Sequence, residues 1–118
     1  MFSIDMQSRI PIYEQLYSNI LSLTIKNVLK SGDQLPSVRE MAKELGVNPN
    51  TITKAYNELE HDGIIYSLAG RGSFIGDIDI SAIKEKASAS FDDAVKEALS
   101  KGFERKELCE RIMKGEKQ

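Results

Sequence analysis

Apolar residues recur three and four positions apart in three stretches between Pro11 and Gly63, and this spacing predicts three amphipathic helices. The first helix is expected to run from about Pro11 to about Lys26, with Asn27 ending it in a left-handed conformation. Residues 28–34 are expected to form a connecting turn. The expected buried positions are Tyr13, Leu16, Tyr17, Ile20 and Leu21 in the first helix, Val38, Met41, Ala42 and Leu45 in the second, and Ile52, Ala55, Tyr56 and Leu59 in the third.

Polar residues with capping functions mark where the second and third helices begin. Ser37 is followed three residues later by Glu40, the pattern of a capping box in which each side chain bonds the backbone N–H of the other residue. Gly46 stands where a left-handed residue ends the second helix. Asn48 then caps the third helix, and Pro49 takes its first position, where no N–H donor is needed. A tight turn is therefore expected between these two helices.

The pattern changes from helical to β-prone after the third helix. Residues 64–68 and 73–75 favour strands, and the glycine-rich turn between them places Arg71 at the tip of a hairpin. From residue 77 onward helical spacing returns, and Gly102 divides it into a long helix and a short one. The apolar stripe of this tail consists of Ile80, Ile83, Ala87, Phe91, Ala94, Val95, Ala98 and Leu99, followed by Leu108, Ile112 and Met113.

This order of elements predicts a mainly α fold with a small β-hairpin. Three helices, the last two joined by a tight turn, followed by a hairpin are typical of a winged helix-turn-helix. We expect this domain to span residues 1–76 and a C-terminal helical hairpin to span residues 77–118.

Composition excludes several classes of function. A chain of 118 residues suits one compact domain with a short appendage and is too short for a large two-lobed enzyme. Its single cysteine, Cys109, has no intramolecular disulfide partner, and no cluster of Cys and His has metal-ligand spacing, so neither metal nor cofactor is expected. The start of the chain carries Asp5 and lacks a signal peptide, and no apolar run is long enough to span a membrane. These features predict a cytoplasmic protein.

Two short segments have the chemistry of a nucleic-acid interface, although the net charge of −2 restricts any such surface to a local one. Asn48, Asn50, Thr51 and Thr53 stand at the positive end of the third helix, where neutral hydrogen-bonding groups suit phosphate oxygens and base edges. Gly70, Arg71 and Gly72 place a cation on a backbone that can approach DNA closely. The alternative is that both segments are ordinary solvated surface.

The segment from position 32 to 52, GDQLPSVREMAKELGVNPNTI, closely resembles the signature of GntR-family transcription regulators. The resemblance covers about residues 8–76 and continues through Lys54-Ala55-Tyr56, Leu59-Glu60, Gly63 and Gly70-Arg71-Gly72-Ser73-Phe74-Ile75. The short helical tail is similar to that of the YtrA-type subfamily. The resemblance implies a sequence-specific DNA-binding repressor, with the third helix in the major groove and the wing on the backbone or in the minor groove. It assigns DNA contacts to Arg39, Asn48, Asn50, Thr51, Thr53, Gly70, Arg71 and Gly72.

The chain departs from the common family pattern at the start of the third helix. Many members have Ser or Thr and then Arg there, whereas this chain has Asn48 and Pro49. An arginine contact to guanine is therefore missing at this position. Lys54, by its position and charge, is our candidate for a compensating contact.

The tail is expected to make a homodimer. Arg39, Lys54 and Arg71 give one copy too few phosphate contacts for strong binding, whereas two linked copies raise affinity by about two to four orders of magnitude. A two-fold dimer predicts an inverted-repeat operator. The expected dimer contacts are Ile80, Ile83, Phe91, Val95, Leu99, Leu108 and Ile112. Alternatively, the stripe folds back onto its own domain. Two helices offer at most a small crevice for an effector, and the sequence identifies none.

Other polar residues suggest no enzyme. His61 is expected to be a surface residue at the end of the third helix, and Cys109 to be a packing residue of the last helix. Tyr56 is expected to lie in the core with a solvated hydroxyl. No nucleophile with an oriented base can be recognised. The remaining alternative to DNA binding is a protein-interaction module that docks a partner on the third helix.

Overall fold

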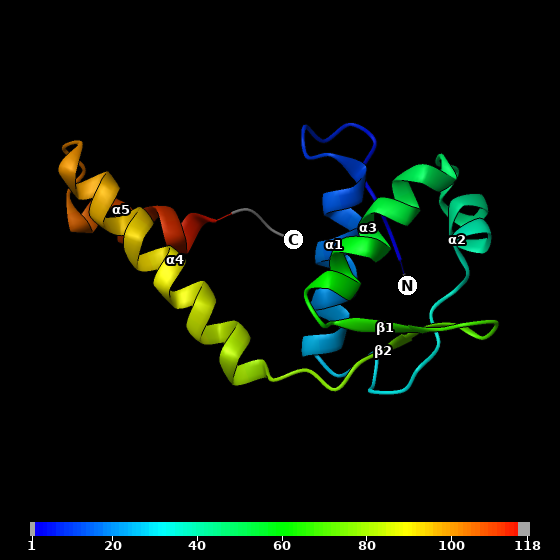
Figure 1. Cartoon of the computed structure of the whole chain (residues 1–118). Coiled ribbons are helices and arrows are strands. Elements are labelled where there is room, and N and C mark those ends of the chain that lie inside the picture. The colour runs from blue at the N-terminus through cyan, green and yellow to red at the C-terminus, as the bar shows by residue number, and fades with distance from the viewer. Residues whose placement is uncertain (1, 116–118) are drawn as a thin grey trace. The chain divides into compact units, whose positions relative to one another are not determined.

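The computed structural model describes residues 2–115, and that part of the chain contains five helices and a two-stranded antiparallel sheet (Figure 1). The elements in chain order are α1 (Ile12–Ile25), α2 (Val38–Leu45), α3 (Pro49–His61), β1 (Ile65–Leu68), β2 (Gly72–Ile75), α4 (Ile80–Ser100) and α5 (Arg105–Lys114). The predicted winged helix-turn-helix followed by two helices is confirmed, and each element begins and ends within a few residues of its expected position. The chain separates into two units, one ending at Ile78 and the other beginning at Asp79, and the expected boundary lay two residues earlier.

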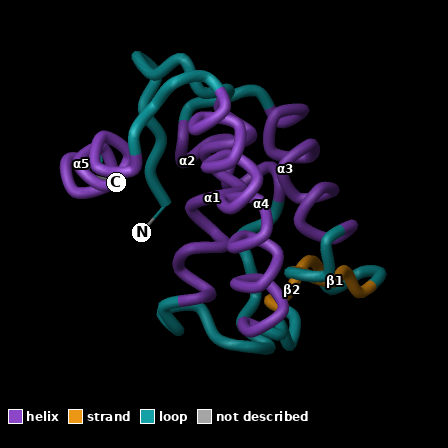
Figure 2. The backbone as a smooth tube through the Cα atoms, turned by 90° about the vertical axis from the view of Figure 1, so that its left-hand side faces the viewer, coloured by secondary structure: helices purple, strands orange, loops and turns teal. Residues whose placement is uncertain are grey.

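The core of the first unit lies between α1, α2, α3 and the hairpin. Helix α3 packs against both α1 and α2, and its C-terminal end leads into β1 (Figures 1 and 2). Leu16, Ile20, Met41, Ile52 and Leu59 are fully buried there. All thirteen apolar positions expected in the three helices are buried or half-buried in this core, which therefore holds α3 against the rest of the unit.

The helix ends have the geometry that the sequence predicts. The Ser37 hydroxyl accepts a hydrogen bond from the Glu40 N–H at 3.1 Å, and the Ser37 N–H donates to Glu40 Oε1 at 3.0 Å. These hydrogen bonds hold the pKa of Glu40 below its ordinary value. Gly46, with φ 69°, ends α2, and the Asn48 side chain accepts from the Asn50 N–H at 2.8 Å. The turn between α2 and α3 is thus fixed at both ends.

The segment before α2 is a third, short strand-like partner of the hairpin, not the simple turn that we expected. In the hairpin Ile65 pairs with Ile75 and Leu68 with Gly72. On the other side of β2, the Leu35 N–H donates to the Ser73 carbonyl at 2.9 Å and the Ile75 N–H donates to the Asp33 carbonyl at 2.8 Å. The outer edge of β2 offers unpaired backbone groups, and an extended neighbouring segment satisfies them.

Helices α4 and α5 form the second unit. Asp79 caps α4 through a hydrogen bond from the Ala82 N–H to its carboxylate at 3.2 Å. Neither helix has a buried residue: Ile83, Val95, Leu99 and Leu108 are half-buried, and Ile80, Phe91 and Ile112 are exposed. Cys109 is also exposed in the single chain, so its expected packing role stays a prediction. Within residues 2–115, no helix combines the length and apolar character needed to cross a membrane.

Candidate nucleic-acid interface

The structure brings most of the predicted contact residues to one side of the first unit. Helix α2, the beginning of α3 and the tip of the hairpin face the same way (Figure 1). Exposed side chains on these three elements are Arg39 in the first turn of α2, Asn48, Asn50 and Thr53 at the start of α3, and Arg71 at the tip. Thr51 is half-buried and is therefore the least accessible of the predicted set.

The solvent-facing side of α3 carries three uncharged residues that we call the polar ridge: Asn50, Thr53 and Asn57. All three are exposed, and they lie opposite the buried stripe that begins at Ile52. Asn57 was missing from the predicted contact set. Its spacing of two helical turns from Asn50 is the signal that identifies it.

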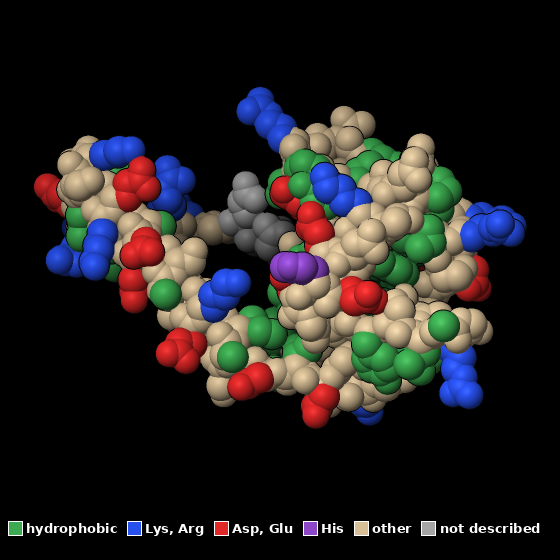
Figure 3. Space-filling model, viewed as in Figure 1, with side chains coloured by type: hydrophobic (Ala, Val, Ile, Leu, Met, Phe, Trp, Pro, Cys, Tyr) green, Lys and Arg blue, Asp and Glu red, His purple; other side chains and the backbone are tan. Residues whose placement is uncertain are grey.

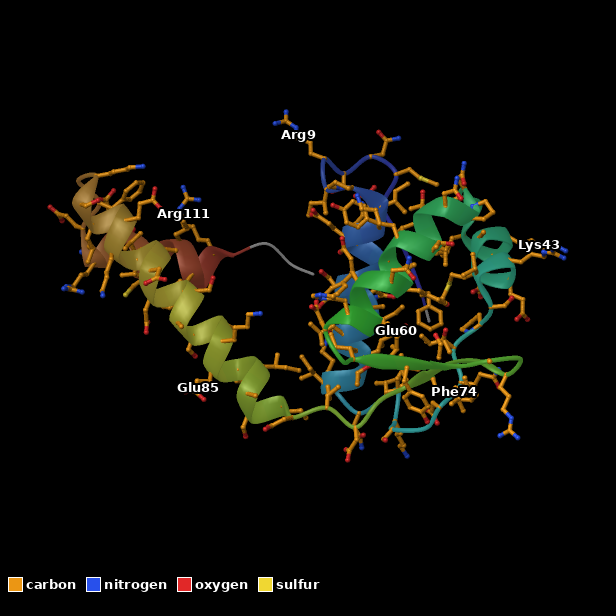
Figure 4. All side chains as sticks on the ribbon, viewed as in Figure 1. Arg9, Lys43, Glu60, Phe74, Glu85 and Arg111 are labelled. Atoms are coloured by element: carbon orange, nitrogen blue, oxygen red, sulfur yellow. The ribbon has the colours of Figure 1, made fainter. Side chains whose placement is uncertain are left out.

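One positive charge, that of Lys54, lies at the edge of this ridge, four residues after Asn50 and three before Asn57, and the others lie around it. The surface over the start of α3 and over α2 is mainly uncharged, and most Lys and Arg side chains project from the margin of the unit, although one lies within the face in view beside acidic side chains (Figure 3). Lys43 points outward from α2, and Arg9 points outward from the loop before α1 (Figure 4). A neutral hydrogen-bonding centre with cations at its margin matches the way in which base edges and phosphates are arranged across a groove.

The tip of the hairpin is held by Gln34, a residue that the sequence analysis did not select. Gln34 Nε2 donates to the Arg71 carbonyl at 2.7 Å, and the Arg71 N–H donates to the Leu68 carbonyl at 2.9 Å. Gly72 has φ 108°, and a Cβ there would lie 3.0 Å from Gln34 Nε2. The positive φ favours glycine here, a side chain at this position would also displace the end of Gln34, and the two hydrogen bonds hold the backbone that carries the Arg71 side chain.

Side-chain bonds also fix the hairpin against α3. The Ser67 hydroxyl of β1 donates to the Glu60 carboxylate of α3 and lies 3.3 Å from the Ser73 hydroxyl of β2. On the other face of the sheet, the Tyr66 and Phe74 rings stack with centroids 5.6 Å apart. Glu60 and Phe74 can be followed in Figure 4. The distance between α3 and the wing tip is therefore set by the protein before any ligand arrives.

Lys54 is turned away from the wing and toward α1. Its Nζ lies 3.9 Å from the centre of the Tyr13 ring, within the range of a cation–π interaction. Lys54 thus lies on the flank of α3 that faces α1.

Tyr56 has a structural role. Its hydroxyl donates to the Pro36 carbonyl at 2.7 Å, and the side chain is 5% exposed. Burial, with nearby Glu40 and Glu44, raises the pKa of Tyr56. The expectation of a solvated hydroxyl is wrong, because the carbonyl before the capping box occupies that position.

The far end of α3 has no catalytic arrangement. His61 is the last residue of α3, and its Nδ1 lies 3.3 Å from Asp62 Oδ1, with 89% of its side chain exposed. Burial and a hydrogen bond to the Asp62 carboxylate raise the pKa of Tyr17. In the described part of the chain, no three His, Cys, Asp or Glu side chains are grouped so that they could hold a metal ion.

Comparison with known proteins identifies the family. Residues 12–75 match the family described as "Bacterial regulatory proteins, gntR family". The chain is 41% identical, over 84% of its length and 76% of the relative's, to the HTH-type transcriptional repressor YtrA of Bacillus subtilis.

Two solved structures have the same fold. A transcriptional antiterminator from Listeria monocytogenes EGD-e is 32% identical with a TM-score of 0.76, over 97% of this chain and 88% of that one. The AraR DNA-binding domain in complex with operator ORX1 is 28% identical with a TM-score of 0.56, over 62% of this chain and 90% of that one. From its residues, its fold and these relatives, the chain belongs to the GntR family of bacterial regulatory proteins, is of the YtrA type, and is a DNA-binding transcription regulator and not an enzyme.

Proposed function

We propose that the chain is a homodimeric repressor that inserts α3 into the major groove of an inverted-repeat operator in the cytoplasm. One observation carries this proposal: the polar ridge of Asn50, Thr53 and Asn57 is flanked on one side of the unit by Arg39 and by the Arg71 tip. The ridge offers amide and hydroxyl groups to base edges, and the cations reach phosphates on either side. The similarity to AraR, whose domain was solved with an operator, supports the same use of the fold.

The predicted contacts divide into two classes in this proposal. Asn48, Asn50 and Thr53 stand where the helix enters the groove, and Thr51 supports them from its half-buried position. Arg39 and the Gly70-Arg71-Gly72 tip contact the backbone or the minor groove. Repression then requires only that an occupied operator excludes polymerase.

The dimer rests on the apolar residues of the second unit. Phe91 is 52% exposed and Ile112 is 58% exposed in the single chain. Ile80, Ile83, Val95 and Leu99 share one face of α4 with Phe91, and Leu108 lies in α5. A run of large apolar side chains exposed along a helix is typical of a surface that a partner covers. A second copy is the proposed partner, and its two-fold symmetry sets the inverted repeat.

Selection from random duplex DNA, followed by fluorescence anisotropy against excess bulk DNA, tests the proposed function. The wild-type chain is expected to enrich an inverted repeat, and Arg39→Ala is expected to lose competition-resistant binding. Lys26→Ala is the matched control, because Lys26 is exposed at the C-terminal end of α1 and is not one of the proposed contact residues. A wild-type chain that enriches no sequence would contradict the proposal.

Sedimentation equilibrium tests the dimer. Phe91→Glu places a charge in the apolar stripe and is expected to yield monomers. Ala89→Glu adds the same charge on the opposite face of α4 and is expected to leave the dimer intact. Equal behaviour of the two variants would refute the interface.

A further inference from the structure

We propose that Tyr13 is a positioning residue that holds Lys54 at the flank of α3 for contact with a DNA phosphate. This inference rests on the proposed DNA-binding function and assigns α1 a part in it. The structural observation is the placement of the Lys54 ammonium over the Tyr13 ring, 3.9 Å from its centre.

Tyr13 is a fixed platform for this contact. Its ring is half-buried and packs against the core, and its hydroxyl donates to Glu14 Oε1 at 3.2 Å. Because α1 and α3 pack together, the ring keeps its place relative to α3. The face of an aromatic ring attracts a cation at this distance.

The contact leaves the ammonium free to bind an anion. Lys54 is exposed, and the ring covers only one side of its ammonium group. An ammonium group has three N–H donors, and no hydrogen bond or ion pair of Lys54 occupies them within the described residues. A lysine side chain with no contacts loses conformational entropy when it binds a phosphate. Because the Tyr13 ring already restricts Lys54, its side chain loses less conformational entropy on binding.

The same contact decides what Lys54 meets on DNA. The polar ridge centred on Asn50 and Asn57 faces the floor of the groove, and Lys54 leans off that ridge toward α1. The walls on either side of a helix in the major groove are the phosphate strands. In this proposal Lys54 therefore adds affinity and salt dependence, and not the base contact that the sequence suggests.

A double-mutant cycle on the selected operator tests the pair. Lys54→Met and Tyr13→Leu are each expected to weaken binding by about 5- to 30-fold for two bound copies, and Tyr13→Phe by less than about twofold. The double variant is expected to bind as Lys54→Met does. Lys54→Met is expected to lower the affinity for the operator and the affinity for bulk DNA by the same factor.

A second substitution separates the ring's charge distribution from its packing. Pentafluorophenylalanine at position 13 keeps the shape of phenylalanine and reverses the polarity of the ring face, so it is expected to bind DNA as weakly as Tyr13→Leu. Thermal unfolding of each variant reports whether the fold is kept. Pentafluorophenylalanine and phenylalanine variants of equal affinity would overturn the inference, as would additive effects in the cycle or altered base preference in Lys54→Met. Failure of the wild-type chain to bind any operator would instead refute the proposed function.

Discussion

The salt dependence of DNA binding in Arg71→Ala is expected to count the copies of the protein on the operator. Arg71 lies at the wing tip, where Gln34 fixes its backbone. Each phosphate that a cationic side chain neutralises changes the slope of log K against log salt by about 0.9 on B-DNA. Arg71→Ala is therefore expected to make the slope shallower by about 0.9 for one bound copy and about 1.8 for a dimer.

The absolute slope gives an independent count. Helices α2 and α3 and the wing supply the exposed cations Arg39, Lys43, Lys54 and Arg71. If all of them contact phosphate, the slope reaches about −3.6 for one copy and about −7 for two. Counting Arg9, which projects from the loop before α1, brings the limit for one copy to about −4.5, so a steeper slope indicates more than one copy.

Fluorescence anisotropy at several KCl concentrations measures these slopes, and titration at DNA concentrations far above Kd gives the stoichiometry. Lys26→Ala serves as the control that removes a charge elsewhere in the first unit. An unchanged slope in Arg71→Ala would refute the phosphate contact of the wing. If Arg71→Ala and Lys26→Ala changed the slope equally, the slope would report the total charge of the protein and not a phosphate contact of Arg71.

Three further predictions concern the contacts that hold the interface together. Gly72 has φ 108°, and the Cβ of Gly72→Ala would lie 3.0 Å from Gln34 Nε2, so this substitution is expected to lower the free energy of unfolding in urea by about 1–3 kcal/mol and to weaken operator binding. Gly70→Ala is the control, because a Cβ there meets open space, and it is expected to lower the free energy of unfolding by about 1 kcal/mol. Equal losses in the two variants would contradict the Gln34 contact. Tyr56→Phe removes the donor to the Pro36 carbonyl and is expected to lower the free energy of unfolding by about 1 kcal/mol. Tyr66 is 41% exposed, so Tyr66→Phe is the control and is expected to lower it by less than about 0.5 kcal/mol. A larger loss in Tyr66→Phe would contradict the stabilising role of the Tyr56 hydroxyl. The lowered pKa of Glu40 contributes stability that is present above the ordinary carboxylate pKa and is lost as the pH falls through the lowered value. When urea unfolding is measured between about pH 6 and pH 3, Glu40→Gln is therefore expected to lose less stability than the wild-type chain. Equal losses would argue against the capping box as the cause.

Contacts between near neighbours in the chain could be predicted from the sequence. The capping box joins Ser37 to Glu40, and the Asn48 cap joins residues two positions apart, so residue type and spacing determine both. The helical stripes likewise follow from periodicity alone. These local signals place α3 and the wing, and with them most of the proposed contact residues.

Contacts between distant segments could not be predicted in this way. The bond from Gln34 to Arg71 spans 37 positions and requires residues 33–35 to pair with β2, which no local pattern indicates. The Tyr13 ring meets Lys54 only because α1 packs against α3. The hydroxyl of Tyr56 meets the Pro36 carbonyl for a similar reason, because α2 packs against α3.

The small number of cations bears on how this regulator achieves specificity. With a net charge of −2 and four exposed cations on α2, α3 and the wing, one copy is expected to gain little from phosphates and to bind bulk DNA weakly. Weak non-specific binding would lower competition from the rest of the genome, and in the proposed complex discrimination then depends on the uncharged ridge of Asn50, Thr53 and Asn57. In the proposed dimer, α4 and α5 supply the missing affinity by joining two such ridges. Because a dissociating dimer forms in proportion to the square of the protein concentration, the proposed dimer is expected to make operator occupancy respond steeply to the amount of the protein itself.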